Sequence, residues 1–172
     1  MNIFETCKIK SIAKGTILLR QGEICKIGCK VITGCLKSYV LDDMGKEHIM
    51  QFAPEGWIIT DMNSLFNNVP SDIIIEAIED SEVYLIESEM LNIWGNASKE
   101  VLLEQIKMLR RNIITANKRT RMLLSSTSEE RYIDFIQTYP SLTQRLPLKL
   151  IAAYIGITPE YLSEIRRKVA SK

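Results

Sequence analysis

The stretch at residues 145–169, RLPLKLIAAYIGITPEYLSEIRRKV, constrains the fold more than any other part of the chain. Apolar residues at helical spacing predict a short helix that ends at Gly156, because glycine accepts the left-handed conformation common at helix C-termini. Thr158, Pro159 and Glu160 then form a start signal for a second helix. Two helices around a tight turn, the second ending in cations, predict a helix-turn-helix. The alternative is an ordinary helical hairpin whose terminal cations only satisfy the helix dipole.

Charge is distributed unevenly over the 172 residues, although the formal net charge is only +1. Residues 1–98 carry a net charge of −6 and residues 99–172 a net charge of +7. This asymmetry suits a basic DNA-binding tail on an acidic sensor, although chance segregation would give the same balance. No apolar run approaches the roughly 18 residues of a membrane span, and the first residues lack the apolar core of a signal peptide. We therefore expect a cytoplasmic protein with no membrane partner.

Short β-segments fill the chain from residue 12 to residue 87. Residues 46–52 alternate between polar and apolar, and the preceding Asp42, Asp43, Met44 and Gly45 are a hairpin-turn signal. Many short strands with turns between them favour a barrel or sandwich over a parallel α/β sheet. The predicted fold class is therefore α+β, with the strands first and the helices last. The other predicted strands lie at residues 16–20, 30–33, 35–41, 73–78 and 82–86.

A heptad pattern runs along the proline-free stretch at residues 91–124. Its mostly apolar positions are spaced alternately by four and three residues, which predicts an a/d seam on one long helix. Such a strict seam favours pairing with a second copy of the chain, whereas the alternative is an amphipathic helix packed on its own β domain. The predicted dimer-interface residues are Leu102, Ile106, Leu109, Ile113, Ala116, Thr120 and Leu123.

Another helix start follows the long helix. Thr127 and Glu130 have the spacing of a capping box, so a domain boundary is expected just before them. The predicted domains are a β domain at residues 1–92, a connecting helix at 93–125 and a helical domain at 126–172. The predicted core face of the new helix consists of Tyr132, Ile133, Phe135 and Ile136.

The chain resembles the Crp/Fnr transcription regulators over nearly its whole length. LPLKLIAAYIGITPEYLSEIRRK and SSTSEERYIDFIQTYPSLTQR are similar to the DNA-reading helices of the family's short-tailed type, which has no wing hairpin. The resemblance implies a double-stranded β-helix (jelly-roll) sensor barrel, a long dimerisation helix and a C-terminal helix-turn-helix. It also implies a homodimer that binds double-stranded DNA, with RNA polymerase as a further partner. Turns of the sensor barrel match at residues 14–15, 21–23, 32–34, 45–47 and 56.

The effector pocket departs from the pattern of this family's cyclic-nucleotide binders. Those proteins use a Gly-Glu pair for the ribose and an Arg for the cyclic phosphate, where this chain has Thr60-Asp61 and Ser71-Asp72. Without a guanidinium the phosphate loses its bidentate partner, and Asp72 would repel it. We therefore expect no tight binding of cyclic AMP or cyclic GMP, and any small-molecule effector is of another kind. Trp57, Ile59 and Phe66 either line the pocket with these four residues or, as we favour, belong to the core.

The four cysteines are expected to be free thiols. Cys7, Cys25, Cys29 and Cys35 have a spacing similar to iron–sulfur ligands, but buried, reduced thiols are the favoured interpretation in a cytosolic chain. The single His48 lies in an alternating strand, and the sequence contains no catalytic triad and no phosphate-binding glycine motif. We expect no enzyme activity, no metal and no cofactor. Two rival functions stay open: a small-molecule-binding β-barrel protein with structural C-terminal helices, and a regulator that senses redox state or metal through its cysteines.

The predicted recognition helix supplies two kinds of DNA contact. Glu160 matches by position the Glu that family members use on a base edge, and a carboxylate can accept a hydrogen bond from cytosine. The other candidates for the base-facing side are Thr158, Tyr161, Ser163 and Glu164. Basic side chains are expected to touch phosphates, which position the protein without specifying sequence. These are Arg145, Lys149, Arg166, Arg167 and Lys168.

Overall fold

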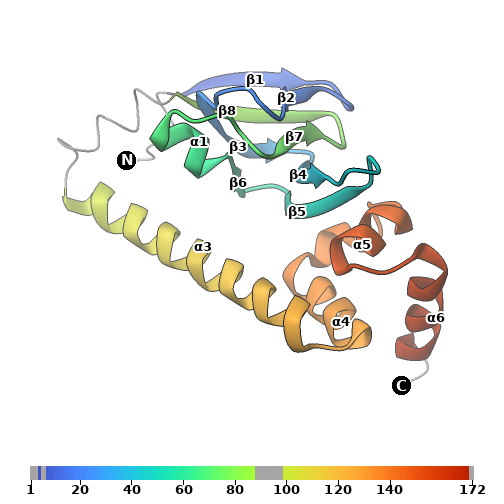
Figure 1. Ribbon diagram of the computed structural model, residues 1–172. Helices are drawn as coiled ribbons and strands as arrows, with labels where there is room; N and C mark the ends of the chain where they lie inside the picture. The colour runs from blue at the N-terminus through green and yellow to red at the C-terminus, as the bar shows by residue number, and fades with distance from the viewer. Residues whose placement is uncertain (1–3, 5–6, 88–98, 171–172) are drawn as a thin grey trace. The chain divides into compact units, whose positions relative to one another are not determined.

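The computed structural model describes residue 4 and residues 7–87 and 99–170, and its chain divides into two compact units (Figure 1). Among the described residues, the first unit, Met1–Val101, contains the strands, a short helix and the first residues of a long helix, and the second, Leu102–Lys172, contains the rest of that helix and the later ones. Residues 93–98, the start of the predicted connecting helix, lie outside the described residues. The finer division into domains at 92 and 125 stays a prediction.

The first unit is an antiparallel sandwich of two four-stranded sheets. One sheet has the order β1-β8-β3-β6 and the other the order β2-β7-β4-β5, so most neighbours in a sheet are distant in the sequence. The short helix α1 connects β6 to β7 (Figure 1). Its elements are β1 (Lys8–Ile12), β2 (Ile17–Leu19), β3 (Ile27–Thr33), β4 (Leu36–Leu41), β5 (Glu47–Ala53), β6 (Ile58–Ile59), α1 (Met62–Asn67), β7 (Ile74–Ala77) and β8 (Ser81–Glu87).

The predicted hairpin turn is confirmed between β4 and β5. Gly45 has a φ of 77°, a conformation that glycine adopts without strain. The Asp42 carboxylate accepts the backbone N–H groups of Met44 and Lys46 at 3.0 and 2.9 Å. The same carboxyl group lies 2.8 Å from Nε2 of His48, which is exposed. These hydrogen bonds lower the pKa of Asp42, so its charge supports the turn.

The core of the first unit lies between the two sheets. Alternate strand residues point into it, as the period of two requires, and the turn at Gly34 brings β3 and β4 close to the start of β8. A Cβ atom at Gly34 would lie 2.4 Å from the backbone oxygen of Asp80, and its φ is 84°. Only glycine fits this corner. The buried core residues include Ile12, Leu19, Val31, Leu36, Ile59, Ile75, Ala77 and Val83.

The second unit begins within a helix of 27 residues and continues with a small helical bundle. The capping box predicted before the next helix, α4 (Ser128–Thr138), is confirmed. Thr127 Oγ1 accepts the Glu130 N–H, and the Glu130 carboxylate accepts the Thr127 N–H at 2.7 Å. Tyr132 and Phe135 of this helix are buried, but Ile133 is exposed, so its assignment to the core face was wrong. The elements are α3 (Lys99–Ser125), α4 (Ser128–Thr138), the 3-10 helix η2 (Pro140–Leu142), α5 (Leu148–Ile155) and α6 (Pro159–Ala170).

A glycine turn joins α5 to α6, as the sequence predicts. Gly156 is left-handed with a φ of 77°, and its N–H donates to the carbonyl of Ala152. The Thr158 hydroxyl accepts the N–H of Tyr161 at 3.3 Å and so caps α6. Leu162 and Ile165 are the buried residues of α6. An aromatic cluster of Phe135, Tyr139 and Tyr154, with centroids 5.5–5.6 Å apart, forms part of the core beneath the turn.

Candidate functional site

The outer face of α6 carries polar side chains on a helix anchored from below. Leu162 and Ile165 point into the bundle, which leaves Glu160, Tyr161 and Glu164 exposed. Tyr161 keeps 49% of its surface, so it does not pack under the helix. This face offers carboxylate acceptors and a phenol on one rigid element. Such a set can make hydrogen bonds with the edges of bases.

Basic residues lie at the end of α6 and around α5. Arg166 and Arg167 are exposed, and so are Arg145, before α5, and Lys149 on α5. Lys168 differs because its Nζ lies 2.7 Å from Oε2 of Glu129 on α4. That hydrogen bond raises the pKa of Lys168, and a phosphate would have to compete with Glu129 for the ammonium group. Thr158 is exposed but its hydroxyl oxygen caps the helix, and the half-buried Ser163 donates its hydroxyl to the carbonyl of Pro159 at 3.0 Å.

The end of α3 is joined to the bundle by cations that sequence reasoning did not single out. The Arg119 guanidinium lies 3.7 Å from the centroid of the Tyr154 ring and donates to the Tyr154 carbonyl at 3.0 Å. The preceding residue, Lys118, forms an ion pair with Asp134 of α4. Arg119 therefore connects the long helix to α5, the helix that precedes the glycine turn. No local spacing signal marks this pair, because 35 residues separate its members.

The predicted seam of α3 is exposed in the single chain. Leu102, Ile106, Leu109, Ile113 and Leu123 keep between 39 and 61% of their surface, and Ala116 and Thr120 are exposed as well. A row of large apolar side chains left in water is unfavourable, by about 25 cal/mol for each Å² that a partner could cover. Single exposed apolar residues are ordinary, but a continuous row at heptad spacing marks an interaction surface.

Several residues of the predicted effector pocket are engaged in hydrogen bonds within the first unit. Asp61 caps α1 by accepting the Ser64 N–H at 3.1 Å, and its other oxygen accepts the Ser71 hydroxyl at 2.7 Å. Thr60 donates to the carbonyl of Ile27, whereas Asp72 is exposed. Two carboxylates in a stretch that has no arginine between Arg20 and Arg110 make a poor place for a phosphate. Trp57 is half-buried against the core and Ile59 is buried, but Phe66 keeps 52% of its surface, so its assignment to the core was wrong.

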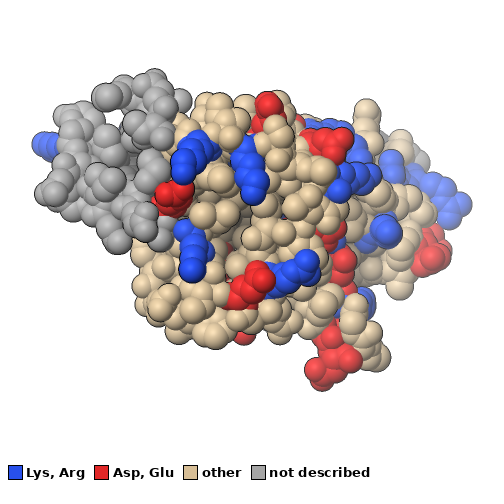
Figure 2. All heavy atoms as spheres, turned by 90° about the horizontal axis from the view of Figure 1, so that it is seen from above, with Lys and Arg blue, Asp and Glu red and all other residues tan. Residues whose placement is uncertain are grey.

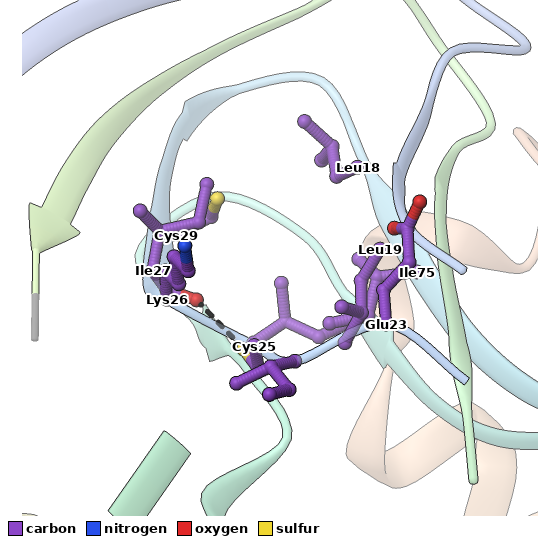
Figure 3. Close-up of a pocket in the computed structure, with 10 residues that line it drawn as sticks. Leu18, Leu19, Glu23, Cys25, Lys26, Ile27, Cys29 and Ile75 are labelled. Carbon is purple, nitrogen blue, oxygen red and sulfur yellow. Dashed lines mark hydrogen bonds between the residues drawn. The ribbon is translucent and has the colours of Figure 1, made fainter. Parts of the chain in front are cut away.

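A pocket of about 200 Å³ lies beside this cluster, and sequence reasoning found only one of its residues, Ile59. Figure 3 shows side chains from β2, from the segment at residues 23–27, from β3 and from β7 around one hollow. The charged residues that line it, Glu23 and Lys26, are exposed. The other lining residues are Leu18, Leu19, Ile24, Cys25, Ile27, Cys29 and Ile75.

The cysteines are free thiols, as expected, and three of them are buried. Cys25 donates its S–H to the Ile27 carbonyl at 3.2 Å, and its Sγ lies 3.3 Å from the Thr60 hydroxyl. Burial, with a smaller effect from neighbouring Cys25, raises the pKa of Cys29 to about 12. A thiol with such a pKa is protonated at neutral pH and reacts slowly. Among the described residues, no three His, Cys, Asp or Glu side chains are placed to hold a metal ion.

The face of the molecule in Figure 2 carries basic and acidic side chains interspersed. Mixed charge of this kind does not attract a polyanion strongly. Within the described part of the chain, no helix combines the length and apolar character that a membrane span requires.

Comparisons with known proteins bear on both units. The cyclic nucleotide-binding domain family matches residues 9–93. FixK2 from Bradyrhizobium japonicum is similar in structure with a TM-score of 0.80 at 21% identity, and the match covers 96% of this chain and 85% of FixK2. A CooA mutant from Carboxydothermus hydrogenoformans matches with a TM-score of 0.76 at 15% identity, over 99% of this chain and 79% of CooA. A Crp/Fnr-family transcriptional regulator from Thermus thermophilus matches with a TM-score of 0.73 at 15% identity, and the match covers 95% of this chain and 86% of that regulator. No curated protein matches the sequence.

Proposed function

Residues 9–93 belong to the cyclic nucleotide-binding domain family and the chain folds like the Crp/Fnr regulators, and on that premise we propose that it is a homodimeric, DNA-binding transcription regulator. The order of the strands fits a jelly-roll sensor barrel, and α5, Gly156 and α6 fit a helix-turn-helix with α6 as the recognition helix. RNA polymerase is the expected partner of such a protein at a promoter.

The exposed face of α6 is the observation that carries this proposal. Its inner side is fixed by Leu162 and Ile165, so Glu160, Tyr161 and Glu164 are held outward on one rigid helix. The exposed Arg166 and Arg167 follow at its C-terminal end, where they can reach phosphates. A barrel protein with purely structural C-terminal helices would have no use for this arrangement. A cysteine-based sensor is disfavoured by the burial and the raised pKa of Cys29.

The exposed seam of α3 supports the dimer. Two parallel copies of this helix would cover each other's apolar row and place the two recognition helices about a two-fold axis. Arg119 would transmit the position of the long helix to α5, because it holds the ring and the carbonyl of Tyr154. Half-sites about one helical turn apart, roughly 34 Å, are expected for such a dimer. Binding-site selection with the purified protein should therefore return an inverted repeat, and a selection that returns none would contradict the proposal.

Glu160 should specify one base pair in each half-site. Replacing Glu160 by Ala removes the acceptor for a cytosine amino group, so preference at that position should fall by roughly 1–3 kcal/mol while the other positions keep theirs. Binding-site selection on the parent and the variant measures this directly. The matched control is Glu164→Ala, a further exposed acid one turn on, which should change a different position or none. Identical base preferences for Glu160→Ala and the parent would remove Glu160 from the reading role.

Arg167 should act on all DNA sequences alike. Arg167→Ala should weaken specific and non-specific binding together and lower the salt slope, the dependence of log affinity on log salt, by about one. The control is the neighbouring Lys168→Ala, which should change the slope less, because its ammonium group is engaged by Glu129. Titrations at several salt concentrations distinguish the two variants. An equal decrease in the salt slope for both variants would show that the ion pair between Lys168 and Glu129 breaks when the protein binds DNA.

Cyclic AMP should not bind tightly. Asp61 and Ser71 are hydrogen-bonded to each other, Asp72 adds a second carboxylate, and the sequence has no arginine between Arg20 and Arg110. A cyclic phosphate would therefore meet negative charge without a guanidinium partner. Calorimetry at micromolar concentrations should show no heat of binding. A micromolar dissociation constant, about −8 kcal/mol, would contradict this view of the pocket.

A further inference from the structure

The pocket beside Cys25 is large enough to hold a small molecule. Its volume is about 200 Å³, whereas an apolar cavity of about 150 Å³ lined by aliphatic side chains is known to stay dry and to take benzene. Its walls come from segments that lie far apart in the sequence and meet only through sheet pairing and the return of the chain at residues 23–27 (Figure 3).

The inner wall of the pocket is mainly apolar. It is built mainly from Leu and Ile side chains together with Cys25 and Cys29, which are 4% and 3% exposed. The S–H of Cys25 and the hydroxyl of Thr60 both donate to the carbonyl of Ile27, so these donors already have an acceptor within the protein. Buried thiols in such a wall behave as small apolar groups. A ligand inside would meet apolar surface rather than hydrogen-bonding partners.

Charge at the pocket is confined to the side that solvent reaches. Glu23 is exposed and its Oε2 accepts the backbone N–H of Arg20 at 2.9 Å, and Lys26 is exposed as well. Ser71 donates its N–H to the carbonyl of Glu23 and its hydroxyl to Asp61, so the Asp61 carboxylate adds negative charge near an incoming anion. Moving a charged group into the apolar interior without a partner is strongly unfavourable. The exposed residues among the lining, including Ile24, show that the pocket is reached from the surface.

We propose that this pocket binds a small, uncharged, apolar molecule of about the size of one aromatic ring. This inference rests on the proposed function, because it gives the sensor barrel a class of ligand that differs from a cyclic nucleotide. The ligand is held by dispersion and by the removal of apolar surface from water. It is selected by size and by its lack of charge.

Toluene and benzoate test the proposal, because the two rings differ mainly in charge. Titration of the full-length protein by ligand-observed NMR, without DNA, should show saturable binding of toluene and none of benzoate at equal concentration. Leu18→Phe fills the pocket and should lower the affinity for toluene about tenfold or more, which corresponds to 1.4 kcal/mol. The matched control is Leu85→Phe, since Leu85 is also half-buried against the same core but does not line the pocket. Thermal melting of both variants checks that the fold persists.

The outcomes separate this proposal from the proposed function. Toluene binding that Leu18→Phe removes and Leu85→Phe keeps supports the pocket. Absence of toluene binding to the parent, equal loss in both variants, or binding of benzoate as tight as that of toluene would overturn it. Because no DNA is present, each of these results leaves the selection of an inverted repeat untouched. Failure of DNA binding would in turn leave the toluene titration unchanged.

Discussion

Aspartate at both Leu109 and Ile113 should convert the protein from a dimer to a monomer and abolish tight DNA binding. Both residues lie in the exposed seam of α3, with 39% and 61% of their surface free in the single chain. In a paired helix the two substitutions would place four carboxylates in the covered interface. Desolvation costs several kcal/mol for each unpaired ion, which exceeds what the remaining seam could offset.

Light scattering and a DNA titration measure the two consequences. The mass should fall by half, and affinity for an inverted repeat should fall to that of one half-site. Ile113 and Ile114 provide a matched pair, since Ile114 is 66% exposed and adjacent but lies outside the seam. The Ile114→Asp variant should remain dimeric, whereas the Ile113→Asp variant should form a weaker dimer. A dimeric double variant would show that the dimer forms through another face.

Alanine at Phe135 should destabilise the helical unit by about 3–5 kcal/mol, the usual cost of a large aromatic side chain removed from a core. Phe135 is fully buried, and its ring contacts those of Tyr139 and Tyr154. A unit of this size has little stability in reserve. We therefore expect α6 to lose its fixed support, and with it specific DNA binding, while the β unit keeps its cooperative unfolding transition.

Helicity followed during thermal unfolding, together with DNA affinity, tests this prediction. The control is Ile133→Ala on the same helix, whose side chain is exposed and whose loss should change stability by less than about 1 kcal/mol. Equal effects of the two substitutions would contradict the role of the aromatic cluster. A loss of DNA binding at unchanged stability would place Phe135 in a different role from support of the bundle.

Features that act within a few residues could be predicted from the sequence. The turn at Gly45, the capping box of Thr127 and Glu130, and the end of α5 at Gly156 all appear as expected. Each depends on a backbone conformation or a hydrogen bond that neighbouring residues supply, so local chemistry is sufficient. The α+β class followed in the same way, from many short β-segments before helical ones.

Burial and side-chain partners were less accessible to sequence reasoning. Phe66 and Ile133 were both assigned to the core, yet both are exposed. An apolar residue at a suitable spacing indicates which face it occupies, but the packing of other elements decides whether that face is covered. The ion pair of Lys168 with Glu129 likewise joins helices that no spacing rule connects.

The sequence by itself determined that strands precede helices, the turn that ends α5, the start of α4, the heptad pattern and the polar face of α6, but β1, β6 and α1 were not among the predicted elements. The features it determined depend on periodicity and on residues close in the chain. Only the tertiary structure decided that the Arg119 guanidinium stacks on the Tyr154 ring and that Cys25, Leu18 and Ile75 surround one pocket. The reason is that sheets with the orders β1-β8-β3-β6 and β2-β7-β4-β5 bring together segments that are distant in the chain. A cavity exists where such segments fail to fill the space between them, and no local pattern records that space.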